Sequence, residues 1–232
     1  LIGKFFGTRF LCFPLIFRLI NGKKNVCQWH CSDKGITTPM NFWHTAHASI
    51  LQFTQWVGDL RVRVVADAYF SNEPFIKELI TRDNPIHVVT RLKKNAVAYD
   101  DPQIPEVPKR GRPRKRGKKL TVLNLFKTEP KVSLNVQLYG KNVTMEAVVK
   151  DLWILGLPQK VRVVVTKVGA KINAFISTDL SLTAEQIIEI YGSRFSIEIA
   201  IRDMKQNLGL EDYQHQSLLP ATRFLHLSAV AY

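Results

Sequence analysis

The chain has 232 residues, a net charge of +14 and 46% hydrophobic residues. This composition excludes an intrinsically disordered chain, because a chain of this length and apolar content can bury a substantial core. The apolar run FLCFPLIFRLI is only about eleven residues long and contains Pro14 and Arg18, which excludes a membrane span of ~20 residues. Three cysteines without a secretory signal indicate reduced thiols and a cytoplasmic location.

The first part of the chain alternates between strand and helix patterns. Strands are expected between residues 5 and 20, and apolar residues at helical spacing predict a helix over 40–57. The β-branched run 61–66 predicts a buried strand. A helix over 73–82 and a strand over 86–91 follow. This order of elements predicts an α/β fold.

Asp67 stands at the end of the strand predicted over 61–66. A carboxylate at the C-terminal edge of a strand lies where open α/β sheets bind ligands. Asp67 could instead be the cap of the helix that begins near Asn72, since Asp and Asn favour such positions. Asp67 is therefore a candidate site residue with a structural alternative.

The segment KRGRPRKRGKK carries eight basic residues. A block of this density predicts binding to a polyanion, with an affinity that falls as salt rises. Its core, Gly111-Arg112-Pro113, resembles an AT-hook, which enters the minor groove of A·T-rich DNA. The alternative is a solvated loop without an ordered target. The candidate DNA-binding residues are Lys109, Arg110, Arg112, Arg114, Lys115, Arg116, Lys118 and Lys119.

The alternating runs KLTVLNLF and KVSLNVQLYGKNVTMEAVV predict β-strands and hairpins between residues 95 and 160. The strand pattern resumes over 161–167 and 172–177. Thr183, with Gln186 three residues later, then predicts a capping box at the start of a long helix.

Four residues of this helix form a stripe, Tyr191, Arg194, Glu198 and Lys205. At about 3.6 residues per turn, their spacing places them within roughly a 60° sector of one helix face. Apolar residues border the stripe, among them Phe195 and Ile201, and Ala200 belongs to the outer side. This pattern predicts a stripe that faces a cleft, whereas a surface helix with ion pairs would expose it.

The spacing Tyr-x2-Arg-x3-Glu-x6-Lys resembles the signature helix of the IS4-like DDE transposases, which cut and rejoin DNA with an RNase H-like domain. The context VVADAYFSN around Asp67 is similar to that of the second catalytic Asp of this family. The resemblance implies that Asp67 and Glu198 are catalytic metal ligands. It also implies that Tyr191, Arg194 and Lys205 hold the DNA backbone, and that the cofactor is Mg2+ or Mn2+.

The family uses three carboxylates, and no Asp precedes Asp33 in this sequence. We expect the first catalytic Asp and its strand to be missing, as in a fragment or a decayed copy. Asp33 falls in a polar loop and Asp59 in a turn, so neither is a good substitute. The C-terminus, within the apolar run HLSAVAY, also resembles a cut end.

The expected fold is an RNase H-like mixed sheet with flanking helices and a β-rich insertion between Asp67 and Glu198. Three regions are predicted, which are the first part of the catalytic domain (1–94), the basic linker with the insertion (95–160), and the second part with the signature helix (161–232). The predicted function is transposase-type strand cleavage and transfer by a partial or inactive copy. A DNA-binding remnant without catalysis is the alternative. The expected partners are double-stranded DNA and a second copy of the chain, in the nucleoid.

Cys27, Cys31, His44 and His47 are spaced almost as in a C2H2 zinc finger. The gap between the two histidines is one residue shorter than usual, which disfavours zinc. In the transposase interpretation these histidines are ordinary polar or packed side chains of the helix over 40–57.

Overall fold

The computed structural model describes residues 2–6, 9–13, 20–21, 25–26, 42–102, 116–212, 214 and 218–232. The chain divides into two compact units. We call Arg61–Arg194 the central unit, and Leu1–Leu60 together with Phe195–Tyr232 the terminal unit.

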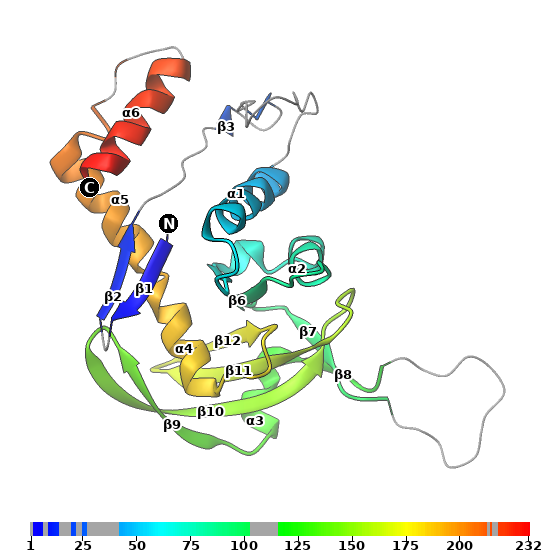
Figure 1. Ribbon diagram of the computed structural model, residues 1–232. Helices are drawn as coiled ribbons and strands as arrows, with labels where there is room; N and C mark the ends of the chain where they lie inside the picture. The colour runs from blue at the N-terminus through cyan, green and yellow to red at the C-terminus, as the bar shows by residue number, and fades with distance from the viewer. Residues whose placement is uncertain are drawn as a thin grey trace. The chain divides into compact units, whose positions relative to one another are not determined.

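The central unit is built on an eight-stranded sheet with the order β5-β6-β12-β11-β10-β7-β8, in which β9 also pairs with β10 (Figure 1). The strands β5 and β6 are parallel, and the other pairings are antiparallel. The strands are β5 (Arg63–Ala66), β6 (His87–Arg91), β7 (Val97–Tyr99), β8 (Lys119–Thr121), β9 (Val132–Leu138), β10 (Lys141–Trp153), β11 (Lys160–Val168) and β12 (Lys171–Ser177).

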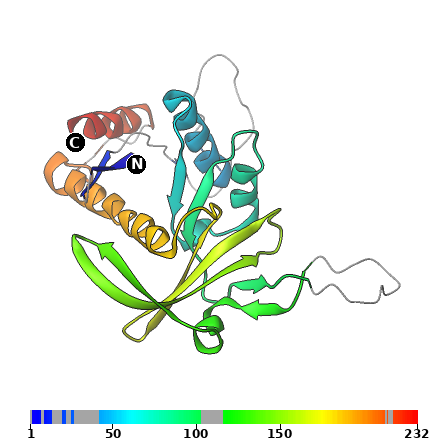
Figure 2. The same ribbon diagram turned by 60° about the horizontal axis from the view of Figure 1, so that its bottom comes forward.

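Helix α4 (Ala184–Ser193) packs on one face of this sheet, in contact with β5, β6, β9 and β12 (Figures 1 and 2). Buried and exposed residues alternate along β9, whereas β6, β11 and β12 carry runs of buried residues, so both faces of these strands contribute to the core. The core between α4 and the sheet contains Val89, Leu134, Val136, Met145, Ala147, Val164, Phe175, Ile187 and Ile188. Helices α2 (Glu73–Ile80) and α3 (Leu125–Thr128) complete the unit.

The predicted strands over 61–66 and 86–91 and the predicted helix over 73–82 are confirmed as β5, β6 and α2. The hairpin predicted from KVSLNVQLYGKNVTMEAVV is confirmed as β9 and β10. Its turn contains Tyr139 and Gly140, both with positive φ (53° and 77°). A two-residue turn of this kind matches the twist of the flanking strands.

The run KLTVLNLF was wrongly predicted to be a strand throughout. Only β8 is extended, and the chain then forms a 3-10 turn, Val122–Asn124, and helix α3. Val122, Leu125 and Phe126 are all buried. Their spacing of three and four residues is helical, and it outweighs the short alternation in the same run.

The terminal unit contains the hairpin β1 (Ile2–Phe6) and β2 (Arg9–Phe13), a short pairing of β3 (Ile20–Asn21) with β4 (Asn25–Val26), and helix α1 (Phe42–Val57). These elements confirm strands near the start and the helix over 40–57. Helix α5 (Ser196–Leu208) contacts β2 and helix α6 (Leu218–Ala231). Gly209, with φ of 63°, ends α5 in a left-handed conformation that glycine adopts without strain.

The prediction of one continuous signature helix is wrong, because α4 ends at Ser193 and α5 begins at Ser196. Ser193 Oγ donates to the carbonyl of Ile190 at 2.6 Å, a bond that competes with the helical pattern. The expected faces also differ, since Ala200 is fully buried whereas Phe195 and Ile201 are exposed. The sheet and its flanking helices nevertheless confirm the α/β, RNase H-like fold class. The division into regions 1–94, 95–160 and 161–232 stays a prediction.

Candidate active site and DNA interface

Asp67 directly follows β5 at the edge where the parallel strands β5 and β6 end. Its backbone carbonyl accepts a hydrogen bond from Thr90 Oγ1 on β6 at 2.8 Å, which fixes the position of this residue. Its carboxylate Oδ1 accepts from the backbone N–H of Tyr69 at 2.8 Å and caps a 3-10 turn, Ala68–Phe70. The half-buried carboxylate is thereby held in a defined orientation at the strand edge.

The alternative that Asp67 is only a helix cap holds for this short turn and not for helix α2. Helix α2 is capped by Asn72, whose side chain accepts from the N–H of Phe75 at 3.0 Å. Capping by Asp67 occupies one carboxylate oxygen. Within the described part of the chain, Oδ2 of Asp67 has no hydrogen bond or ion pair. A half-buried anionic oxygen of this kind suits a hard divalent cation.

Arg91 lies beside Asp67 at the same edge of the sheet. In the parallel register, Ala66 is opposite Thr90, so the next residues along the two strands are Asp67 and Arg91. Arg91 is exposed. The sequence interpretation missed this residue, because only the β5–β6 register brings it next to Asp67. A guanidinium at this edge can hold a phosphate group.

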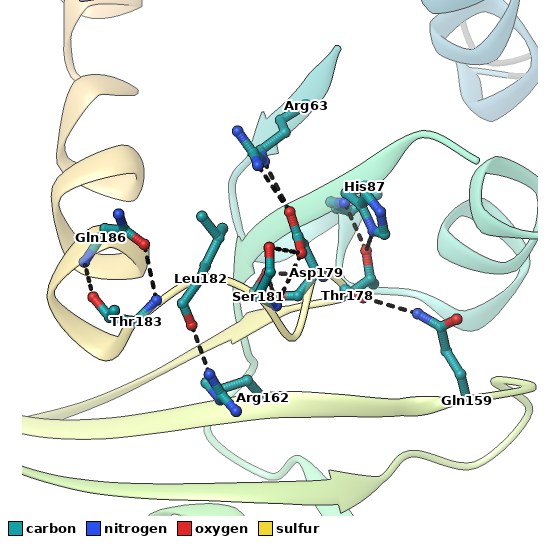
Figure 3. Close-up of polar contacts among 12 residues, drawn as sticks. Arg63, His87, Gln159, Arg162, Thr178, Asp179, Ser181, Leu182, Thr183 and Gln186 are labelled. Carbon is teal, nitrogen blue, oxygen red and sulfur yellow. Dashed lines mark hydrogen bonds and ion pairs between the residues drawn. The ribbon is translucent and has the colours of Figure 1, made fainter. Parts of the chain in front are cut away.

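A second carboxylate, Asp179, binds Arg63 at the start of β5, the opposite end of this strand from Asp67 (Figure 3). It is buried and accepts from Arg63 Nη2 at 2.9 Å, from Ser181 Oγ at 2.6 Å and from the Ser181 N–H at 3.0 Å. Burial raises the pKa of Asp179, but hydrogen bonds from Ser181 and Arg63 outweigh burial and lower this pKa to about 2. Both carboxylate oxygens have protein partners, so Asp179 is a structural residue.

Thr178, next to Asp179, connects β12 to the start of β6 (Figure 3). Its hydroxyl accepts from the N–H of Val88 at 2.9 Å and lies 3.3 Å from Nδ1 of His87. Its carbonyl accepts from Gln159 Nε2 at 2.8 Å. The polar groups of Thr178 and Asp179 at this end of the sheet are therefore satisfied by hydrogen bonds within the protein.

Tyr191 and Arg194 belong to the end of α4 in the central unit. The helix begins with the predicted capping box between Thr183 and Gln186. The Tyr191 ring packs against Phe175, with ring centroids 4.8 Å apart, and the Arg194 guanidinium lies 5.8 Å from the Tyr191 centroid. The Tyr191 ring therefore supports Arg194 through a cation–π contact.

Glu198 and Lys205 lie on α5, in the terminal unit, and both are exposed. Lys205 forms an ion pair with Glu211. The four signature residues are thus divided between the two units.

The basic block lies in the segment that joins β7 to β8, and its last residue, Lys119, begins β8. Five of its candidate residues, Lys109, Arg110, Arg112, Arg114 and Lys115, lie outside the described residues. Arg116 is described and lies over the Tyr99 ring, 5.7 Å from its centroid, and Lys118 and Lys119 are exposed. At the base of the loop, the Gly117 N–H donates to the Asp100 carbonyl at 2.9 Å. The described end of the basic block, from Arg116 to Lys119, thus lies at the edge of the sheet, next to β7.

Of the four residues of the zinc hypothesis, Cys27 and Cys31 lie outside the described residues, and only the backbone of His44 is described. His47 is buried in α1. In the described ranges, no group of three or more His, Cys, Asp or Glu side chains is placed to hold a metal ion. No helix in these ranges has the length and apolar character of a membrane span.

The chain matches one known protein family over most of its length. Residues 44–232 match the family described as transposase DDE domain. The chain belongs to this transposase family. Among curated proteins, none matches it. Family membership implies a transposase-type function on DNA and a divalent metal, and Asp67 lies at the sheet edge where such a ligand is expected.

Proposed function

We propose that this protein is an IS4-like DDE transposase that cleaves and transfers DNA strands, with Asp67 and Glu198 as metal ligands. One observation carries the proposal for the central unit. The Asp67 carboxylate is fixed at the edge of a parallel strand pair, beside Arg91, with one oxygen that has no described protein partner. Glu198 is assigned from the signature spacing and the family match.

Divalent ions, Mg2+ or Mn2+, held by these carboxylates would supply activation of the attacking oxygen and stabilisation of the leaving oxygen of a phosphodiester. The protein's part is to hold and orient the reactants. Asp67 and Glu198 supply hard oxygen ligands, and Arg91 binds a backbone phosphate through its planar guanidinium. Tyr191, Arg194 and Lys205 hold the DNA backbone near the scissile phosphate, with Tyr191 positioning Arg194.

The partner we propose is double-stranded DNA, bound as paired transposon ends by a homodimer in the nucleoid. The net charge of +14 and the basic loop between β7 and β8 support this partner. The candidate residues of this loop, from Lys109 to Lys119, would add phosphate contacts, and Arg112 would enter a narrow minor groove.

The second candidate function is DNA binding without cleavage. It is favoured by the assignment of two carboxylates where the family uses three. A partial or inactive copy would bind magnesium weakly, since two carboxylates poorly fix two ions at about 3.5–4 Å.

The test is nicking of a supercoiled plasmid that carries the gene with its flanking DNA, in Mg2+ or Mn2+. A transposase should nick the plasmid only with metal, and Glu198→Gln should abolish nicking. Glu185→Gln, a change on α4 outside the proposed site, is the matched control and should keep wild-type activity. Binding of the same plasmid without nicking would support the second candidate. Metal-dependent nicking that survives Glu198→Gln would contradict the catalytic assignment.

A further inference from the structure

Tyr69 is an exposed aromatic residue on the turn that Asp67 caps. Its side chain is 53% exposed, and its backbone N–H is bound to the Asp67 carboxylate at 2.8 Å. This hydrogen bond couples the position of Tyr69 to that of Asp67. An aromatic ring of this exposure, two residues from a proposed metal ligand, can contact the substrate.

The Tyr69 ring is the exposed end of a series of three aromatic rings in contact. It meets Phe70 edge to face, with centroids 5.7 Å apart and an interplanar angle of 83°. Phe70 packs on Phe75 at 5.2 Å, and Phe75 is buried on α2. This series of contacts restricts the rotamers of Tyr69, so a ligand that stacks on the ring loses little conformational entropy from the protein.

The chemistry around Tyr69 is that of a nucleotide site. Arg91 is an exposed cation at the same edge of the sheet and can hold a phosphate. One other aromatic residue of the described central unit is exposed, Tyr139. It lies at the β9–β10 turn, separated from β5 by β6, β12, β11 and β10. Position, rather than exposure alone, distinguishes Tyr69.

We propose that Tyr69 stacks on an unpaired base of the DNA substrate, next to the phosphate held by Arg91. The inference rests on the proposed function, since it assumes that this edge receives the DNA strand. Stacking on a tyrosine ring is sequence-tolerant, because every base has a π-face. A base must leave the duplex stack to reach the ring, and this is easiest at a mismatch or a single-stranded position.

The experiment uses the full chain and two short duplexes of random sequence, one fully paired and one with a single unpaired 2-aminopurine. The wild-type protein should bind the second duplex more tightly and quench its fluorescence by stacking. Tyr69→Ala should weaken binding to the unpaired probe by about 5–150-fold, with little effect on the paired duplex. Tyr69→Phe should behave as the wild type, because the ring and not the hydroxyl makes the contact.

Two further variants keep the result interpretable. Tyr69→Leu retains an apolar side chain on Phe70 but lacks a π-face, so it should lose the preference even if Tyr69→Ala does not fold. Tyr139→Asn removes an exposed ring elsewhere, at a positive φ that Asn tolerates, and should keep the preference. Equal binding of both duplexes by the wild-type protein would overturn the proposal, as would a preference that survives Tyr69→Leu.

The plasmid assay separates this inference from the proposed function. A Tyr69-dependent preference without metal-dependent nicking would retain the base-stacking site and contradict only the catalytic role. Nicking that depends on Glu198, together with a preference that survives Tyr69→Leu, would contradict only the base-stacking site.

Discussion

The two ends of the β5–β6 strand pair place carboxylates in opposite environments. At the end where β5 starts, Asp179 is buried, and both its oxygens accept hydrogen bonds from Arg63 and Ser181. At the end where β5 stops, Asp67 is half-buried, and one of its oxygens has a described protein partner, the Tyr69 N–H. Both carboxylates lie at an end of the same strand pair, so the difference comes from their hydrogen-bond partners.

The two carboxylates differ in their capacity to bind a ligand. Asp179 already has its charge compensated by the protein, and its lowered pKa is the consequence. Perturbed pKa values often mark functional sites, but here the perturbed group stabilises the fold. Asp67 has one oxygen that caps the 3-10 turn and fixes its direction, and its second oxygen is the one that we propose binds a cation. Substitution of Asp67 should therefore affect metal binding, whereas substitution of Asp179 should affect stability.

The largest effect should come from Asp67→Asn. Asn caps a helical turn as well as Asp does, so the free energy of unfolding should change by less than about 0.5 kcal/mol. Mn2+ affinity, measured by electron paramagnetic resonance, should fall by more than the about 10–100-fold that an outer-shell change costs. Asp83→Asn, an exposed change in the loop before β6, is the control. Unchanged Mn2+ binding in Asp67→Asn would remove Asp67 from the site.

Asp179→Asn should instead affect stability. The variant leaves Arg63 beside a neutral amide, and loss of one partner from a buried ion pair costs about 3 kcal/mol. Urea unfolding monitored by circular dichroism measures this change in the free energy of unfolding. Asp203→Asn, which breaks an exposed pair with Arg202, should cost less than about 1 kcal/mol. Equal values for the two variants would mean that the Arg63–Asp179 pair is not structural.

The pH dependence of stability should also reflect Asp179. Its pKa is lowered from 3.8 to about 2 in the folded state, so its contribution is complete above pH 3.8 and is lost as the pH falls through about 2. The contribution is about 2 kcal/mol, from roughly 1.36 kcal/mol per pKa unit. Acid unfolding curves of the wild type and Asp179→Asn should converge over this range. Curves that stay parallel down to about pH 2 would contradict the assignment.

The smallest effect should come from single exposed arginines. Arg91→Ala should lower the slope of log K against log salt for duplex binding by about 0.9, the value for one lost phosphate contact. Arg82→Ala, at the other end of β6, removes the same charge away from the proposed site and should leave the slope unchanged. Fluorescence anisotropy at several salt concentrations measures both. Equal slopes for the two variants would place the DNA elsewhere.

Local sequence patterns predicted most of the elements correctly. The β-branched run before Asp67 became β5, the alternating runs around Tyr139 became a hairpin, and Thr183 with Gln186 formed the capping box. These features depend on residues close together in the chain, so their periodicity and capping chemistry are sufficient. The match to the transposase DDE domain family confirms the expected transposase family, whereas the IS4-like signature spacing stays a prediction.

Local patterns failed where neighbouring residues gave conflicting signals. In KLTVLNLF, alternation and helical spacing overlap, and burial of Val122, Leu125 and Phe126 selected the helix. The signature segment was predicted as one helix, but it is interrupted between Ser193 and Ser196, and Ala200 is buried on the face expected to be outer.

The strand that ends at Asp67, the capped start of α4 and the strongly basic character of the chain follow from the amino-acid sequence. The residues beside Asp67 follow from the way the strands pair in the folded sheet. Arg91 is next to Asp67 because β5 and β6 pair in parallel. Asp179 forms an ion pair with Arg63 because β12 pairs with β6 and so ends near the start of β5. Strand register and ion pairs between distant residues depend on packing of the whole sheet, so no local pattern in the chain encodes them.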